Sequence, residues 1–445
     1  MQVKKDNINL LLILFPLVYV FGTFITNLYV VLVFLIIFAL KKNDLRLYAH
    51  EKVLILFLIY IFLQSLYLKN YDALPRVLFM SLFSYIFISS KYFNLKLYKL
   101  KDYGFLFYFF LSFLFLFFFY YIIFQFDINL LNRFSGFFGD EKILGSFLSK
   151  FFILIFNLYL FSKNKKFTNK LFIFYTLSCL LFTIFSIERM ALIIFILNVL
   201  LYSIFKKKYL SLFLIVSLMF IVIFTTYNLA PVIKKHFLTV LGDTGIFQSF
   251  SHKHSTTGIR NQNYLDNSQT YLEHTSPEDS FKILNVTRKR LDDRSNNINQ
   301  KNIIYFFDNF HGAIILNALD LLKNDYILGV GIKEFRNLCK IKILTINKVD
   351  YVLQCSTHPH NSYVEILVET GVVGLALIMT FLLMFLIKII KNFDNKSNIS
   401  CSLFSLFLII ILPFQSTGSF FSSRYVFFYF TTFILINLFI TSDEQ

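Results

Sequence analysis

Hydrophobic residues run along this chain in long blocks, each about the length needed to cross a lipid bilayer. A helix needs about 20 apolar residues to span a hydrocarbon core about 30 Å thick. The first block, from Ile8 to Ala39, is too long for one span and is interrupted by Gly22 and several polar residues, so we divide it near residue 24. The other predicted spans cover residues 52–68, 75–92, 104–124, 144–162, 168–186, 190–205, 209–229, 364–390, 400–416 and 424–441. The pattern predicts an all-α polytopic membrane protein with about 12 transmembrane helices.

The composition agrees with this pattern. Hydrophobic residues make up 57% of the chain and charged residues 16%, whereas a soluble protein has about 45–50% apolar and about 25% charged residues. An ordinary soluble domain is therefore excluded. The net charge of +17 could suggest nucleic-acid binding, but in a membrane protein Lys and Arg usually report the orientation of the spans. A cleaved signal peptide is the alternative for the first segment, although no small-residue cleavage site follows it.

The distribution of Lys and Arg predicts which loops face the cytoplasm. With the N-terminus inside, the inner loops and tail carry twenty Lys and Arg residues and the short outer loops carry six. This asymmetry favours cytoplasmic termini; in a bacterial cell the opposite face of the inner membrane is the periplasmic side. We therefore expect a membrane domain at 1–230 with spans 1–9, a large periplasmic loop at 231–362 and a membrane domain at 363–445 with spans 10–12. Nucleotides do not reach that outer side, so a substrate there must carry its own leaving group.

The outer loop divides into two parts. Residues 236–300 are rich in Ser, Thr, Asn and Asp, which predicts a flexible spacer. His252, His254 and His274 lie in it, but no residue completes a recognisable metal-ligand spacing. From 303 to 362 apolar residues return at three- and four-residue steps, which predicts an amphipathic helix followed by a catalytic segment. Gly329 and Gly331 would end this helix or turn the chain, with phosphate cradling as the alternative.

Two cysteines flank a stretch of this second part. Cys339 and Cys355 are the only cysteines outside predicted spans, in a compartment that permits disulfides. We predict that they pair, which would link the segment of Arg336 to that of His358 and stabilise the fold by about 3 kcal/mol; two free thiols are the alternative. Cys179 and Cys401 lie in predicted spans and are expected to be packing residues.

The densest group of polar side chains begins just after Cys355. His358, His360, Asn361, Glu365 and Glu369 lie immediately before and inside the first turns of an apolar span. Ionisable groups at membrane depth cost at least about 2.5–3.5 kcal/mol each and usually line a cavity or a substrate path. Histidine titrates near working pH, which suits a general base. Simple solvation and a zinc site at the two histidines are the alternatives; a third placed ligand is lacking, so we predict no metal.

Two arginines on the predicted outer face are candidates for binding phosphate. Arg189 follows a very short turn between two spans, and Arg336 lies beside Cys339. The planar guanidinium is the side chain best suited to a phosphate diester or diphosphate. For Arg189, a structural salt bridge to Glu188 is the alternative. The segment from Arg133 to Lys150 combines glycines and charges before a span, and it could be re-entrant or interfacial near the same cavity.

At these residues the sequence resembles the O-antigen ligase family, which includes O-antigen polymerases and bacterial protein O-oligosaccharyltransferases. The resemblance covers roughly residues 130–380, and its last piece is the most specific. The matching pieces, in order, are FSGFFGDEKILGSFLSK, SIERMAL, GVGIKEFRNLC and CSTHPHNSYVEILVETGVVG.

The resemblance implies a membrane glycosyltransferase of the GT-C type that inverts the anomeric carbon and needs no metal, nucleotide or other cofactor. In this family the donor is a glycan on undecaprenyl diphosphate, and the acceptor of the ligases is the lipid A-core oligosaccharide. Carried over by motif, Arg189 and Arg336 look like diphosphate binders and His358 or His360 like the base. Asn361, Glu365 and Glu369 are further candidates for contact with the diphosphate or glycan. Partners would be the donor, the acceptor and membrane lipids, with no nucleic acid.

The sequence also departs from the family pattern. Many members carry an arginine where His311 opens the amphipathic helix, and a proline where Tyr326 precedes the glycine motif. One expected cationic contact is therefore unassigned, and Arg288, Arg290 and Arg294 are possible suppliers. Polymerisation of lipid-linked repeats and protein glycosylation remain alternatives, because the sequence does not identify the acceptor. A polysaccharide transporter is the alternative from another class, but we find no internal repeat of the kind transporters often have.

Overall fold

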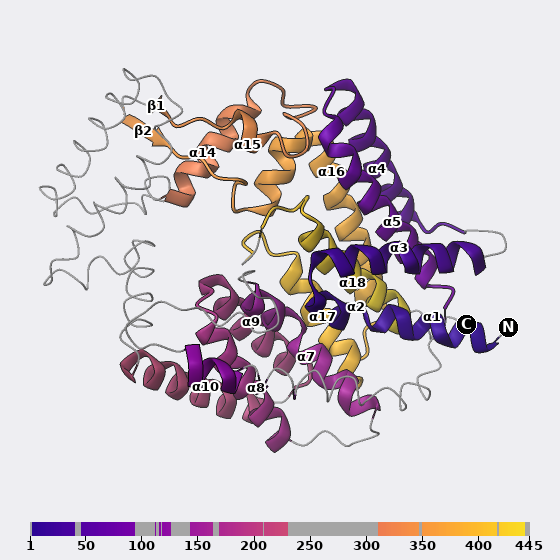
Figure 1. Ribbon diagram of the computed structural model, residues 1–445, viewed down its shortest axis with the longest axis vertical. Helices are drawn as coiled ribbons and strands as arrows, with labels where there is room; N and C mark the ends of the chain where they lie inside the picture. Colours follow the sequence, from indigo (N-terminus) through magenta and orange to yellow (C-terminus); the bar gives the residue numbers. More distant parts are fainter. Residues whose placement is uncertain are drawn as a thin grey trace, which may run out of the picture. The chain divides into compact units, whose positions relative to one another are not determined.

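The computed structural model describes residues 2–40, 46–93, parts of 112–125, 143–162, 169–207, 209–229, 310–346, 349–415 and 418–440. Most of these residues are helical (Figure 1). The chain forms two compact units, and we describe each by itself. The first contains residues 1–236 and 374–445, and the second contains residues 237–373.

The first unit begins with a broken helical segment. Helix α1 (Gln2–Ile13) and the short α2 (Phe15–Val18) lead into a 3₁₀ turn, η1 (Tyr19–Phe21). Gly22 then breaks the chain with φ 91° before α3 (Thr23–Leu40) starts. Positive φ values of this kind are freely open only to glycine. The break lies close to the division near residue 24 that the sequence predicts.

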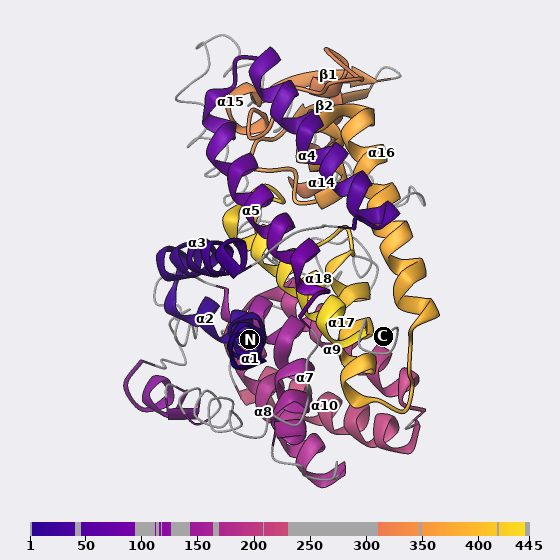
Figure 2. The ribbon, with the colours of Figure 1, turned by 90° about the vertical axis from the view of Figure 1, so that its right-hand side faces the viewer.

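A group of apolar helices follows. Helix α4 (Ala49–Tyr67) and α5 (Leu74–Ser90) are joined by η2 (Tyr71–Ala73), and α5 packs against α3, α4 and α18 (Ser423–Ile440). Figure 2 shows α5 beside α18. A buried ion pair between Lys91 and Glu51 ties the end of α5 to the start of α4. Glu51 also accepts a hydrogen bond from the backbone N–H of Tyr48 at 2.8 Å, which caps its own helix.

The centre of the first unit is α7 (Leu144–Ser162), whose residues from 144 to 158 are all buried. It packs against α8 (Asn169–Phe185), α9 (Arg189–Phe205) and α17 (Asn398–Ile410), and α10 (Tyr209–Leu229) packs on α8 and α9 (Figure 1). Before α7 in the chain, a π-helical turn, η4, covers Tyr121–Gln125. Buried hydrogen bonds cross between the helices. Asn157 Nδ2 donates to Ser402 Oγ at 2.6 Å, and Asn198 Nδ2 donates to the carbonyl of Ser149 at 2.9 Å. Such bonds join helices in membrane bundles.

Large apolar side chains also point outward from this unit. Phe24 on α3 is 78% exposed, and Phe220 on α10 is 70% exposed. Within the described residues, four helices are long and apolar enough to cross a membrane, namely Thr23–Leu40, Ala49–Tyr67, Tyr71–Ser90 and Ser362–Lys391. Shorter apolar helices cover most of the other predicted spans, while the predicted span 104–124 falls mainly outside the described residues. These helices are consistent with a multi-pass membrane protein.

The second unit contains α14 (Phe310–Leu322), α15 (Phe335–Leu338), strands β1 (Lys342–Ile346) and β2 (Val349–Leu353), and the first part of α16 (Ser362–Lys391). Ile314, Ala318 and Leu322 of α14 pack with Phe335 and Val368 in one apolar core. The predicted amphipathic helix is therefore present. The two strands form an antiparallel hairpin in which Lys342 pairs with Leu353. This hairpin is an exception to the all-α expectation, because the sequence analysis assigned no strand to 303–362.

Candidate active site

The glycine motif after α14 lies against the first part of α16, backbone to backbone. The N–H groups of Val330 and Gly331 donate to the carbonyls of Val368 and Glu369 at 2.8 and 3.0 Å. Gly371 interrupts α16 with φ 67°, so α16 is kinked at this point. A Cβ atom on Gly329 would lie 2.6 Å from the carbonyl oxygen of Val368. The glycines therefore serve close backbone contact with α16. The positive φ values of Gly329 and Gly331, 74° and 102°, agree with the turn of the chain that the sequence predicts.

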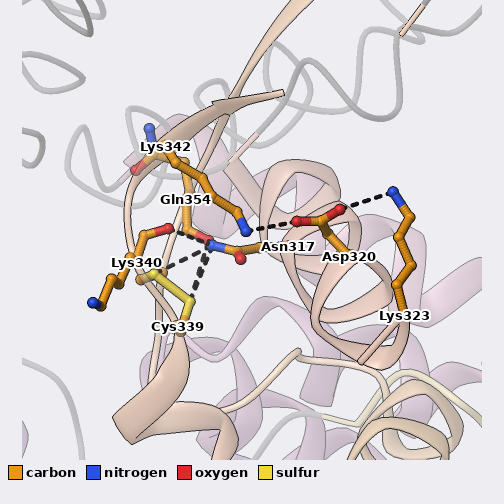
Figure 3. A network of polar contacts seen from close by, with 8 residues as sticks. Asn317, Asp320, Lys323, Cys339, Lys340, Lys342 and Gln354 are labelled. Carbon is orange, nitrogen blue, oxygen red and sulfur yellow. Dashed lines mark hydrogen bonds and ion pairs between the residues drawn. A yellow bond between two sulfur atoms is a disulfide. The ribbon is translucent and has the colours of Figure 1, made fainter. Parts of the chain in front are cut away.

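A disulfide closes the base of the β-hairpin. Cys339 precedes β1, Cys355 follows β2, and the two Cα atoms are 5.7 Å apart. The side chain of Asn317 lies beside this link and donates to the carbonyls of Lys340 and Gln354 at 2.9 and 3.1 Å (Figure 3). These two carbonyls belong to residues next to the two cysteines, so a single buried amide holds both strands of the base to α14.

A second contact joins α14 to the hairpin. The carboxylate of Asp320 accepts from Lys342 on β1 at 2.6 Å and from Lys323, just after the end of α14, at 2.8 Å (Figure 3). Such surface pairs contribute little stability singly, but this one adds to the contacts of Asn317. The chain that enters and leaves the hairpin is thus fixed on α14, and it carries Arg336 on one side and His358 on the other.

Three histidines lie together where the chain approaches α16. The rings of His358 and His360 have centroids 4.2 Å apart, and His311, at the start of α14, packs edge-on against His360 at 4.8 Å. His358 Nδ1 is within 3.0 Å of Thr357 Oγ1, and His360 Nε2 is within 3.1 Å of Ser356 Oγ. His360 has φ 57°, a conformation that residues other than glycine rarely adopt and that is often found at functional sites.

The surroundings of the two predicted bases favour the neutral imidazole. Burial lowers the pKa of His358 to about 4, and the positive charges of Lys333, Arg336 and His311 add to this effect. Burial also lowers the pKa of His360 to about 3, with contributions from His358 and His311. Both rings therefore hold a lone pair at neutral pH, and such a ring can accept a proton.

The other predicted residues of this segment contact the protein itself. Asn361 caps α16, because its Oδ1 accepts from the N–H groups of Tyr363 and Val364 at 3.1 and 3.2 Å. Glu365 and Glu369 are buried on one face of α16, and Glu369 accepts from the backbone N–H of Lys333 at 2.7 Å. This bond fixes the loop that leads to Arg336. Contact of these three residues with a substrate stays a prediction.

Lys333 was not singled out in the sequence. It is buried, adopts φ 67°, and lies close enough for its charge to lower the pKa of His358. Arg336, three residues later on α15, is exposed and acts on His358 in the same way. The position of Lys333 and Arg336 shortly after the glycine motif is the sequence feature that could have indicated both residues. In the sequence, His311 is notable only as a departure from the family pattern. Nothing in the sequence indicates that it lies beside His360.

Arg189 belongs to the first unit, where it is the first residue of α9; its side chain is outside the described residues. The preceding Glu188 accepts from the backbone N–H groups of Gly145 and Ser146 on α7, at 2.9 and 3.0 Å. The resembling segments that contain LGSF and SIER therefore meet in space. The histidines of the spacer, Arg133, Arg288, Arg290 and Arg294 fall outside the described residues. Among the residues that the structure describes, no group of His, Cys, Asp and Glu could hold a metal ion.

Comparison with known protein families gives a match over residues 171–379, described as O-antigen ligase. This stretch is similar to O-antigen ligase domains. The family predicted from the motifs is therefore confirmed, and every predicted site residue lies inside the ligase domain. The resembling piece at 134–150 lies outside it. No curated protein matches the chain.

The ligase domain and the apolar helices together support a multi-pass membrane protein of lipopolysaccharide biosynthesis. At the level of chemistry, the family supports a glycosyltransferase of the O-antigen ligase and polymerase type that uses lipid-linked glycans.

Proposed function

We propose that this protein transfers a glycan from undecaprenyl diphosphate to the lipid A-core oligosaccharide on the periplasmic side of the inner membrane. The observation that carries the proposal is the pair of imidazoles at the start of α16, flanked by the positive charges of Lys333 and Arg336. An uncharged base beside fixed cations fits a reaction in which a hydroxyl loses a proton while a diphosphate leaves.

We assign the base to His358. If its Nδ1–H donates to Thr357 Oγ1, then Nε2 carries the lone pair and can accept the proton of an acceptor hydroxyl. For His360 the contact of Nε2 with Ser356 uses the other ring nitrogen, and the ring packs between His358 and His311. His360 then orients His358, and the cations act on the base more than on its neighbour.

The reaction is a single in-line displacement. The acceptor oxygen attacks the anomeric carbon from the face opposite the leaving group, and its proton passes to His358. The bond between the anomeric carbon and the diphosphate oxygen breaks, and the electron pair leaves with undecaprenyl diphosphate. Arg189 and Arg336 stabilise the negative charge that develops there, because preorganised cations in a water-poor site do this effectively. The configuration at the anomeric carbon inverts, and no metal is required.

Purified protein in detergent, with a polyprenyl-diphosphate-linked glycan and a lipid A-core acceptor, tests this proposal. We expect transfer by the wild type and a loss of about 10²–10⁴-fold in kcat for His358→Ala, with a smaller loss for His360→Ala. Lys323→Ala, which removes an exposed cation just after α14, is the control and should keep the wild-type rate. Unchanged transfer in His358→Ala would refute the assignment of the base.

The acceptor decides between ligase and polymerase. The ligase extends lipid A-core with long chains in the assay, and its loss from cells leaves lipid-linked polymer without polymer on the core. A polymerase instead joins lipid-linked repeats to each other, and its loss leaves cores capped by a single repeat. The second pattern would replace the proposed acceptor while keeping the chemistry.

A further inference from the structure

The turn between α8 and α9 is fastened to the start of another helix by one carboxylate. Glu188 occupies the N-cap position of α9, yet its side chain makes no cap bond there. Its Oε1 accepts from the N–H of Gly145 and its Oε2 from the N–H of Ser146, both in the first turn of α7. Both oxygens of Glu188 thus hold backbone groups that α7 cannot satisfy within itself.

The contact leaves little freedom to the backbone on either side. A Cβ atom at position 145 would collide with Ser186 Oγ and lie 3.1 Å from Glu188 Oε1. Ile187, between these two residues, has φ 57°, and such conformations persist only when the surrounding structure fixes them. The backbone of the turn is therefore fixed up to the residue before Arg189.

A buried lysine balances the charge of this carboxylate. Lys150, one helical turn after Ser146, is 1% exposed and donates from Nζ to Ser146 Oγ at 2.6 Å. The backbone N–H of Ser146 donates in turn to Glu188 Oε2 at 3.0 Å, so Ser146 links the lysine to the carboxylate, and the positive end of the α7 dipole acts in the same direction as the lysine. Buried ionisable groups in membrane helices are rare and usually functional. Here the lysine and the helix end offset the negative charge of Glu188.

We propose that Glu188 is a positioning residue for Arg189, with Lys150 as its buried counter-charge. This inference rests on the proposed function, in which Arg189 binds the diphosphate of the donor. Arg189 directly follows the fastened turn and opens α9, so the place of its backbone is set by the bonds of Glu188.

A double-mutant cycle on donor binding tests this inference. Glu188→Gln should raise the KM for the donor and the Kd for undecaprenyl diphosphate by roughly ten- to a hundredfold, because a small misplacement of a binding group can cost that much. In an Arg189→Gln background the same change should have almost no further effect on either constant. If the effects of Glu188→Gln and Arg189→Gln on these constants were fully additive, Glu188 would not act through Arg189, and the inference would be overturned.

Glu51→Gln supplies the matched control. Glu51 is a buried carboxylate of the same unit that accepts a backbone N–H and pairs with Lys91. Its replacement should lower the thermal stability while leaving the affinity for undecaprenyl diphosphate unchanged. If Glu188→Gln lowers stability as Glu51→Gln does and leaves the affinity equally unchanged, its role is structural only and the inference is wrong.

Lys150 gives a second, independent cycle. Lys150→Met should weaken donor binding by leaving Glu188 without its counter-charge. Because both effects act through the same carboxylate, adding Lys150→Met to Glu188→Gln should weaken binding little further. Effects of the two changes that add in full would exclude the charge balance. Because binding of undecaprenyl diphosphate is measured without an acceptor, a wild type that binds but transfers nothing would refute the proposed function and still leave the cycles decisive.

Discussion

The segments before α9 and before α16 use the same local device to different ends. Each places a residue with φ 57° directly before the N-cap of an apolar helix, Ile187 in one and His360 in the other. The next residue then presents a side-chain acceptor. Asn361 accepts hydrogen bonds from the first turn of its own helix, whereas Glu188 accepts them from the first turn of α7.

The difference separates a local requirement from a tertiary one. Any short acceptor, such as Asp or Ser, can replace a residue that caps its own helix. Glu188 must reach another helix, engage two N–H groups at once and match the charge of Lys150. The segment before α16 depends instead on backbone contacts around the glycines and on the disulfide. Substitutions in and before α16, and the pH dependence of transfer, test this division.

Gly371→Ala should destabilise the protein by about 2–5 kcal/mol, since a left-handed alanine costs about 1–2 kcal/mol and forced overpacking about 1–3 kcal/mol. Its Cβ would collide with the backbone of Ile327. Thermal unfolding in detergent can be followed with a thiol-reactive dye, because Cys179 and Cys401 are free and buried. Gly374→Ala, at a position without the left-handed φ, is the control. Equal stability of the two variants would contradict the backbone contact.

Replacing both Cys339 and Cys355 by Ser should lower the free energy of unfolding by about 3 kcal/mol through loop-closure entropy. The double change avoids new thiols that would react with the dye. The bonds of Asn317 hold the hairpin base in the native state only, so they do not replace the constraint on the unfolded chain. A variant as stable as the wild type, with or without reductant, would mean that the hairpin does not need the link.

The rate of transfer should fall only at acidic pH. With the pKa of His358 lowered to about 4, its imidazole is neutral at pH 7 and stays so down to about pH 5. Protonation removes the base, so kcat/KM should be halved near pH 4 and fall about tenfold for each further unit. An acid limb near the 6.5 of an exposed histidine would show that burial and the neighbouring cations do not act on the base.

Asn361→Ala should cost about 1 kcal/mol of stability as the loss of a helix cap, and Asn361→Asp should restore most of it. If capping is its whole role, the KM values for donor and acceptor remain those of the wild type. A raised KM in both variants at unchanged stability would instead support the contact of Asn361 with the substrate that the sequence suggested.

Much of the fold could be predicted because membrane helices are encoded by local composition. The break at Gly22, the helix α14 and the start of α16 lie within a few residues of their predicted places. The hairpin at 342–353 was missed, since its short strands lie between two cysteines in a stretch without a longer pattern. Within the candidate site, the pairing of Cys339 with Cys355 and the contact between His358 and His360 could be predicted from the sequence. Residues this close along the chain have few alternative arrangements.

The sequence by itself determined that this is a membrane protein of helices and which family it resembles, and it predicted functional residues around Arg189 and from Arg336 to Glu369. Only the tertiary structure decided what these residues touch. It brought His311 to His360, Lys333 to Glu369, and Glu188 to the first turn of α7. The physical reason is that hydrophobic length is a property of consecutive residues. Hydrogen bonds and charge compensation depend instead on groups that are far apart in the chain and meet only when the helices pack.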